Sequence, residues 1–269
     1  MLHVLAGRTA LVTGASRGLG VFIARRLAKE RMHLVLSARD GRKLAALREE
    51  LAREGLDVRI VAADVRSASE RARLVEEAGA IDVLVNNAGL EVTRAFADQS
   101  EADVAAQLET NLVAPIDLSR RVLPGLLARR AGALVHVSSM SGKSPTPYNA
   151  IYAATKYGLN GFSSSIAIEL EGTGVSTGVV CPSFVAEAGM WADTGLRAPS
   201  LMREVRPEAV ADGVIAVIRG AQEVLVTPTP VRPLLALREL APRLTGALLA
   251  RMGVLATLEA RAAHAARPR

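Results

Sequence analysis

The segment Thr13-Gly14-Ala15-Ser16-Arg17-Gly18-Leu19-Gly20 joins a strand-like run, Thr9–Thr13, to a helix-like stretch, Gly18–Arg31. Glycines at such a junction permit a tight turn and let backbone N–H groups approach a pyrophosphate at the positive N-terminus of the helix. The spacing is Gly-x-x-x-Gly-x-Gly, whereas the ordinary Rossmann loop has Gly-x-Gly-x-x-Gly. The segment predicts a dinucleotide-binding turn of variant spacing; a turn that only packs a strand on a helix is the alternative.

The rest of the chain repeats this alternation of apolar strand-length runs and amphipathic helix-length stretches, which is typical of a parallel sheet buried on both faces. Seven strands are predicted, at Thr9–Thr13, His33–Ser37, Val58–Ala62, Asp82–Val85, Ala133–Ser138, Ser176–Cys181 and Glu223–Val226. Helices are predicted at Gly18–Arg31, Gly41–Glu54, Ser69–Ala78, Glu101–Arg129 (kinked at Pro115), Ile151–Glu171 and Pro207–Arg219. We expect one doubly wound α/β domain over residues 1–227, with helices on both faces of its sheet.

Most of the net positive charge lies beyond residue 227, where the predicted domain ends. The 269 residues carry a net charge of +6, and the segment 228–269 holds seven arginines and two glutamates, hence five of the six net positive charges. With regular leucines from Leu237 to Leu258, this segment is predicted to be a basic amphipathic helical tail. Packing on the domain or on a second subunit is favoured over contact with a membrane surface. Nucleic-acid binding is not expected, because the tail has no aromatic residue for stacking.

Several protein classes are disfavoured by composition. Half of the residues are hydrophobic, so a disordered chain is excluded. Cys181 is the only cysteine, and no intramolecular disulfide can form. The N-terminus does not resemble a signal peptide, and the longest uncharged run, 172–186, is too short for a spanning helix. We expect a cytoplasmic protein, and no metal site is predicted.

One rival enzyme class uses the same loop. Gly14-Ala15-Ser16-Arg17-Gly18 also matches Gly-x-Ser-x-Gly, the nucleophile elbow of α/β-hydrolases. A hydrolase needs a histidine later in the chain, and only His33, His136 and His264 are available. The first two lie inside predicted strands and the last lies in the tail, so this reading is disfavoured.

Three further elements follow the loop in order. Asn86-Asn87-Ala88-Gly89 comes after the fourth predicted strand, Ser139 after the fifth, and Tyr152-Ala153-Ala154-Thr155-Lys156 starts 13 residues beyond that serine. With the Thr-Gly-x-x-x-Gly-x-Gly loop, this series resembles the short-chain dehydrogenase/reductase family over about residues 7–227. The resemblance implies an NAD(P)-dependent oxidoreductase that interconverts a carbonyl and a secondary alcohol.

The resemblance also implies roles for single residues. Tyr152 and Lys156, at i and i+4, share one face of a helix, and a neighbouring cation lowers the pKa of a phenol. Tyr152 is therefore expected to act as general acid/base near neutral pH. By resemblance, Lys156 holds the nicotinamide ribose, Ser139 binds the substrate carbonyl, and Asn111 supports a water that relays protons to Lys156. The implied cofactor-binding residues are Gly14, Ser16, Arg17, Gly18, Leu19, Gly20, Arg39, Asp64, Val65, Asn87, Ala88, Gly89, Tyr152, Lys156, Pro182 and Val185.

The end of the second predicted strand indicates which cofactor is preferred. Ala38 stands where NAD-preferring relatives carry Asp, and Arg39 follows it. Arg39 and Arg17 together suit a 2′-phosphate, so NADP(H) is favoured over NAD. Asp40 could bind the ribose of NAD, but its place before the predicted helix Gly41–Glu54 favours an N-cap.

The substrate side departs from the family pattern. After the sixth predicted strand, relatives usually have Pro-Gly and then a Thr near the nicotinamide carboxamide, whereas this chain has Ser183 and Glu187. Either Glu187 accepts from the carboxamide, or it faces solvent while the backbone of Val185 makes the contact. Residues 188–206 are expected to form a lid over the substrate. Its candidate apolar lining residues are Met190, Trp191, Leu196, Leu201 and Met202.

These residues suggest a medium or bulky apolar carbonyl or alcohol as the substrate. A non-catalytic dinucleotide-binding regulator on the same fold is the alternative function, which the intact Tyr152 and Lys156 pair disfavours. By analogy with the family, the helices Glu101–Arg129 and Ile151–Glu171 are expected to form the contacts of a homodimer or homotetramer.

Overall fold

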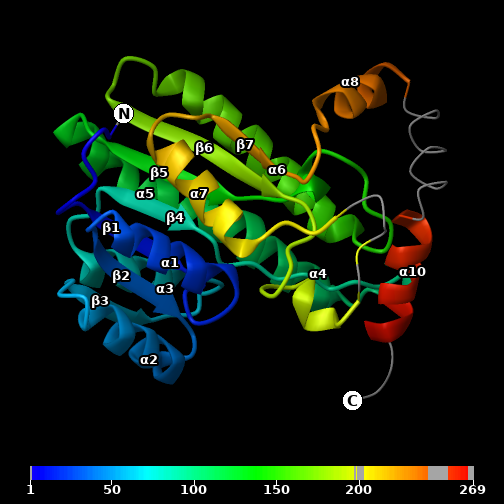
Figure 1. Ribbon diagram of the computed structural model, residues 1–269, viewed down its shortest axis with the longest axis horizontal. Helices are drawn as coiled ribbons and strands as arrows, with labels where there is room; N and C mark the ends of the chain where they lie inside the picture. Colours follow the sequence, from blue (N-terminus) through cyan, green and yellow to red (C-terminus); the bar gives the residue numbers. More distant parts are fainter. Residues whose placement is uncertain (1, 197, 199–202, 242–253, 266–269) are drawn as a thin grey trace.

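The computed structural model describes residues 2–196, 198, 203–241 and 254–265. Seven parallel strands form one sheet in the order β3-β2-β1-β4-β5-β6-β7 (Figure 1). They are β1 (Thr9–Thr13), β2 (His33–Ala38), β3 (Val58–Ala62), β4 (Val83–Asn86), β5 (Gly132–Val137), β6 (Val175–Pro182) and β7 (Glu223–Val226). The strand order reverses between β1 and β4, which is where doubly wound sheets bind their ligands. The predicted fold class is confirmed.

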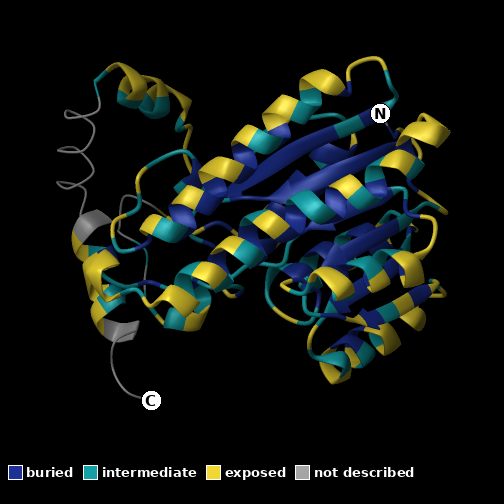
Figure 2. Cartoon of the chain, turned by 180° about the vertical axis from the view of Figure 1, so that it is seen from behind, coloured by how far each residue is buried: buried dark blue, intermediate teal, exposed yellow. Residues whose placement is uncertain are grey.

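Helices cover both faces of the sheet. One layer contains α1 (Leu19–Lys29), α2 (Gly41–Ala52) and α7 (Pro207–Ile218), and the other contains α3 (Ala68–Ala78), α5 (Ala114–Arg129) and α6 (Ala150–Glu169). Figure 2 shows the strands as a buried layer between helices whose outer faces are exposed. The helices thus cover both faces of the sheet, and its carboxyl end carries the site described below.

Because the side chains of each strand point alternately to the two faces of the sheet, one hydrophobic core lies on each face. In β1, Ala10 and Val12 pack with α1, α2 and α7, whereas Leu11 packs on the other face with Leu74 of α3 and Leu118 of α5. Successive strand residues point to opposite faces, so a strand covered on both sides must be apolar throughout. Together the two clusters make the sheet a rigid support for the loops at its carboxyl end.

The predicted helix Glu101–Arg129, in which two segments run together, contains a wider helical turn that was not predicted. The structure has α4 (Glu101–Leu108), a π-helical turn (Glu109–Val113) and then α5. Pro115 lacks an N–H and cannot donate to the carbonyl of Asn111, four residues earlier. The N–H of Ala114 donates to the carbonyl of Glu109, five residues back, so the chain widens into a π turn just before the proline. Such turns often mark functional sites, and this one contains Asn111.

The tail segment contains two described helices, α8 (Arg232–Leu240) and α10 (Val254–Ala265). Leu237 and Leu240 of α8 are exposed, whereas Leu258 of α10 is buried. Residues 242–253 and 266–269, also part of the predicted tail, lie outside the described residues. Within the described ranges, no helix is both long and apolar enough to cross a membrane.

Candidate active site

A pocket of about 880 Å³ opens at the carboxyl ends of β1, β2, β4, β5 and β6, a volume within the usual range of small-molecule sites. The structure brings almost all of the predicted site residues to its wall. They are Gly14, Ser16, Arg17, Gly18, Leu19, Arg39, Asp64, Val65, Asn87, Ala88, Gly89, Ser139, Tyr152, Lys156, Pro182 and Val185. Gly20 and Asn111 are not among the residues of this wall.

The glycine loop after β1 packs directly against the loop after β4. Gly14 has φ +68°, and a Cβ built on it would lie 2.8 Å from Cα of Ala88. The Thr13 hydroxyl accepts from the N–H groups of Asn87 and Ala88, at 3.0 and 3.1 Å. The Asn87 side chain donates back to the Thr13 carbonyl at 2.9 Å. The two motifs therefore form one unit, and only glycine allows this approach.

Helix α1 begins at the same place, with its N-terminus at the pocket. No side chain caps it, and no acidic residue lies in its first turn. Unpaired N–H groups and the helix dipole at such an end attract anions. The loop residues present therefore fit a pyrophosphate group of a dinucleotide.

The end of β2 decides between the two interpretations of Asp40. The Asp40 carboxylate accepts from the N–H groups of Arg42 and Lys43, at 3.1 and 3.2 Å, and caps α2. The predicted N-cap is confirmed. Arg39 is exposed at the pocket wall, and Lys43, which the sequence analysis missed, lines the same wall. These cations fit a phosphate on the adenosine ribose.

Arg17 and Asp64 each form an ion pair with another residue of the protein. Arg17 forms an ion pair with Asp193 at 2.5 Å, so this guanidinium contacts the segment 188–206. Asp64 accepts from Arg66, and this hydrogen bond is the main cause that lowers the Asp64 pKa. Asp64 is therefore ionised and held in place at the end of β3, next to Val65.

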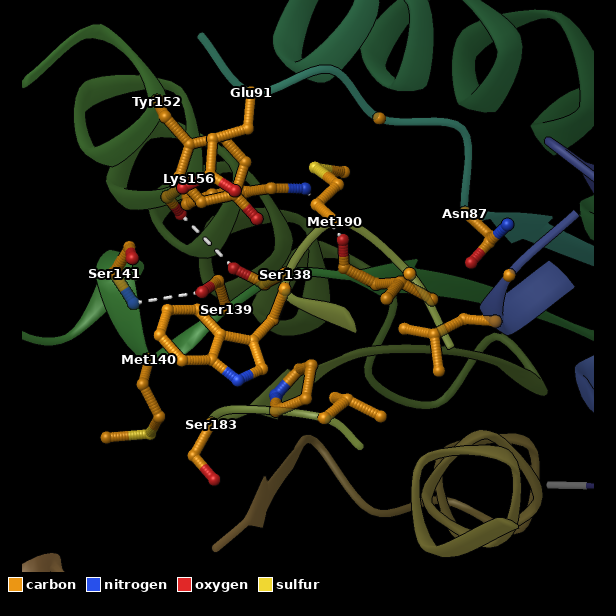
Figure 3. A pocket seen from close by; sticks show the side chains of 18 of the residues that line it. Asn87, Glu91, Ser138, Ser139, Met140, Ser141, Tyr152, Lys156, Ser183 and Met190 are labelled. Carbon is orange, nitrogen blue, oxygen red and sulfur yellow. Dashed lines mark hydrogen bonds between the residues drawn. The ribbon is translucent and has the colours of Figure 1, made fainter. Parts of the chain in front are cut away.

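Ser139, Tyr152 and Lys156 lie together on one wall of the pocket (Figure 3). The Ser139 hydroxyl oxygen accepts from the N–H of Ser141 at 3.1 Å, which leaves its own O–H available as a donor. Lys156 Nζ donates to the carbonyl of Val137 at 2.9 Å and lies 5.5 Å from the ring centroid of Tyr152. The i, i+4 spacing in α6 brings the cation beside the ring, as expected.

The expected lowering of the Tyr152 pKa is wrong. Its pKa is raised above the ordinary value, with burial as the largest cause and the Glu91 carboxylate as the next. A hydrogen bond with Ser139 and the charge of Arg261 act in the opposite direction. Burial also lowers the pKa of Lys156 to about 8. Tyr152 is therefore a protonated phenol at neutral pH, the form required of an acid.

Asn111 does not face the pocket; it holds the chain beyond β4. Its amide accepts from the Leu90 N–H at 2.8 Å and donates to the Leu90 carbonyl at 2.7 Å. One turn earlier, the Gln107 side chain accepts from the Val92 N–H at 3.1 Å. Glu91 lies between these two anchors, so the π turn and α4 fix its position. The predicted water relay from Asn111 stays a prediction.

On the predicted nicotinamide side, the structure shows where Glu187 and Val185 lie. Glu187 is exposed, outside the pocket wall, and has φ +59°. The Val205 N–H donates to the carbonyl of Phe184, and the Val205 carbonyl accepts from the N–H of Ala186. Neither of these hydrogen bonds involves the N–H or the carbonyl of Val185. The solvent-facing position of Glu187, with Val185 at the wall, agrees with the second alternative.

The substrate end of the pocket contains residues that the sequence analysis did not select. From the segment 188–206, Met190 and Trp191 line the wall, Leu196 does not, and Leu201 and Met202 lie outside the described residues. The tail adds Leu234, Leu235 and Arg238 of α8 and Leu258 and Arg261 of α10. Glu91 is a further missed residue. Its only sequence signal is its place directly after Asn86–Leu90.

Comparison with known proteins agrees with this geometry. The family model described as short chain dehydrogenase matches residues 8–197. A ketoacyl reductase, HetN, of Nostoc sp. is 40% identical over 235 residues, which are 86% of this chain and 82% of that protein.

Two solved structures are similar over most of this chain. A metagenomic short-chain oxidoreductase in complex with NADP has 33% identity and a TM-score of 0.71, and the match covers 84% of this chain and 99% of that one. An actinorhodin polyketide ketoreductase variant with NADPH has 32% identity and a TM-score of 0.74, covering 82% and 96%. With the glycine loop, the loop after β4 and the Ser139, Tyr152 and Lys156 wall, these matches show that the chain belongs to the short-chain dehydrogenase/reductase family of oxidoreductases.

Proposed function

We propose that the protein is an NADP(H)-dependent oxidoreductase that interconverts a ketone and a secondary alcohol on a medium or bulky apolar substrate. The observation that carries this proposal is the convergence of Ser139, Tyr152 and Lys156 on one wall of the pocket that the glycine loop opens. An acid, a hydroxyl donor and a cation at one place suit proton transfer to a carbonyl oxygen.

Each of the three residues has a defined task in ketone reduction. A bound nicotinamide dinucleotide supplies the hydride. Ser139 donates its hydroxyl hydrogen to the carbonyl oxygen, and Tyr152 gives its phenolic proton to that oxygen as negative charge develops. Lys156, with one hydrogen used on Val137, has two more donors for the ribose hydroxyls. Asn111 is the positioning residue for the chain segment at Leu90, and its water relay remains part of the proposal.

The preference for NADP(H) is supported by the second strand and its surroundings. Ala38 presents no carboxylate, Asp40 is occupied as a helix cap, and Arg39 and Lys43 line the wall. Relatives crystallised with NADP and NADPH agree with this choice. The predicted cofactor residues from Gly14 to Val185 are proposed to keep their assigned contacts.

Replacing Arg39 by alanine is expected to raise KM for NADPH by about tenfold to a hundredfold, because a hydrogen bond to a charged group contributes about 1.5–3 kcal/mol. KM for NADH should stay close to its wild-type value. Arg42→Ala is the matched control, since Arg42 is exposed nearby in α2 but absent from the pocket wall. Equal losses with both cofactors, or equal effects of the two substitutions, would argue against a phosphate contact.

The substrate class is tested with a panel of ketones. The names of the relatives, ketoacyl and polyketide ketoreductases, make 3-ketoacyl thioesters and bulky cyclic ketones the first choices. The apolar wall formed by Leu90, Met190, Trp191 and Leu258 fits such groups. The loss of nicotinamide absorbance on mixing with each ketone should be measured. Tight NADPH binding without turnover of any ketone would favour the non-catalytic regulator.

Assembly and location stay predictions. Exposed Leu108, Leu127, Tyr157 and Ile168 lie on the helices expected to form subunit contacts, in agreement with a homodimer or homotetramer. Contact of the tail with a membrane surface is supported only by exposed Leu237 and Leu240 of α8. A cytoplasmic location likewise rests on the sequence.

A further inference from the structure

The C-terminal helix α10 places an arginine in the active site. Arg261 pairs with Glu91 through two hydrogen bonds, Nη1 to Oε1 and Nη2 to Oε2, both 2.7 Å long. The two side chains are only 9% and 8% exposed. The Arg261 guanidinium also lies 5.5 Å from the ring centroid of Trp191, and Nη2 donates to the Met190 carbonyl at 3.3 Å. One side chain of α10 therefore contacts both the loop after β4 and the segment 188–206.

Glu91 has little freedom to leave this position. Asn111 holds Leu90 on one side, and Gln107 holds Val92 on the other. The Glu91 side chain lies beside Tyr152 and Lys156 in Figure 3. A carboxylate in such a buried place is costly unless it is paired and fully hydrogen-bonded. In the part of the chain that the structure describes, the bidentate partner of Glu91 is Arg261.

We propose that Arg261 is a positioning residue of the active site, which acts through Glu91: it compensates the carboxylate charge beside Tyr152 and holds α10 as the closing wall of the apolar substrate pocket. This inference rests on the proposed oxidoreductase function. It makes helix α10 part of the active site, because Leu258, one turn before Arg261, lines the same pocket and is buried.

The charges around Tyr152 come from several elements. The titratable, charged or hydroxyl groups that face it are Lys156 of its own helix, Glu91 after β4, Ser139 after β5, Cys181 of β6 and Arg261 of α10. Glu91 raises the pKa of Tyr152 and Arg261 lowers it. The two partners therefore act on the phenol with opposite signs, and substitution of each is expected to move the pKa of Tyr152 in a different direction.

The test uses alcohol oxidation, in which Tyr152 must accept a proton, so kcat rises with pH as long as the pH lies below the apparent pKa of the phenol. Arg261→Met leaves the Glu91 charge uncompensated and should shift this rise to higher pH by about one unit. Glu91→Gln leaves the guanidinium uncompensated and should shift it to lower pH by about as much. At a fixed pH on the rising limb, Arg261→Met is then about tenfold slower and Glu91→Gln about tenfold faster than wild type.

The double variant Glu91→Gln/Arg261→Met should return close to the wild-type pH profile. Glu259→Gln is the matched control, because Glu259 is exposed on the same helix and its substitution removes the same unit of charge. Shifts of the same sign in the two single variants, or a Glu91→Gln profile that coincides with wild type, would overturn the proposed action on Tyr152.

A second readout does not depend on turnover. Hydrogen exchange of the peptide spanning residues 254–265 should become faster in Glu91→Gln and stay at the wild-type rate in Glu259→Gln, because only the former removes the bidentate contact. Unchanged exchange in Glu91→Gln would overturn the closing role of α10. If the wild type turns over no substrate of the panel, the proposed function fails, whereas this exchange experiment still decides whether the pair holds α10.

Discussion

Tyr152→Phe is expected to lower kcat for ketone reduction by about 10²–10⁴-fold, the usual contribution of a general acid, while NADPH still binds. The substitution removes only the phenolic oxygen. The ring, which is 8% exposed and lies beside Lys156, keeps its packing in α6. Burial and the Glu91 carboxylate raise the pKa of the phenol, so it carries its proton throughout the neutral range and has one to donate.

Tyr148→Phe is the control for this experiment. Tyr148 lies four residues earlier, outside the pocket wall, and its substitution should leave kcat unchanged. Steady-state kinetics give kcat, titration of nicotinamide fluorescence gives the affinity for NADPH, and thermal unfolding reports on the fold. A Tyr152→Phe enzyme that keeps wild-type kcat would remove Tyr152 from the mechanism. A large loss of NADPH affinity would instead assign it to binding.

The sheet could be predicted from the sequence because it depends on local pattern. The bounds of β1, β3 and β7 agree with the prediction, whereas β4 begins and ends one residue later than expected. A strand buried on both faces has no alternation to mark its ends. The π turn before Pro115 could not be predicted, because the amphipathic pattern continues through it. Only the missing N–H of the proline interrupts the regular series of α-helical hydrogen bonds.

The residues expected to bind the cofactor could also be predicted from local sequence patterns. Its residues occupy short motifs at strand ends, where the parallel sheet brings them together whatever the rest of the chain does. Glu91 and Arg261 are different, because 170 residues separate them. An arginine in a basic tail has no local feature that marks it as an active-site residue. The pKa of Tyr152 was predicted with the wrong sign because burial and the Glu91 charge, neither visible in the Tyr152 and Lys156 spacing, outweigh the effects that favour the phenolate.

Gly20→Ala is expected to abolish dinucleotide binding and to reduce the free energy of unfolding by about 1–3 kcal/mol, as overpacking usually does. Gly20 lies in the first turn of α1, where alanine has the better helix propensity by about 1 kcal/mol. However, a Cβ on Gly20 would lie 2.2 Å from the Gly14 carbonyl oxygen and 2.8 Å from Cα of Ala15. Both are backbone atoms, so the phosphate loop must move.

Gly161→Ala separates this steric effect from helix propensity. Gly161 is an exposed helical residue of α6, and a Cβ there would meet no atom within 4 Å. This substitution should stabilise the protein by about 0.5–1 kcal/mol and leave NADPH affinity unchanged. Denaturant unfolding and calorimetric titration with NADPH measure the two quantities for both variants. If Gly20→Ala bound NADPH as the wild type does, the close contact between α1 and the Gly14 turn would not be what shapes the phosphate site.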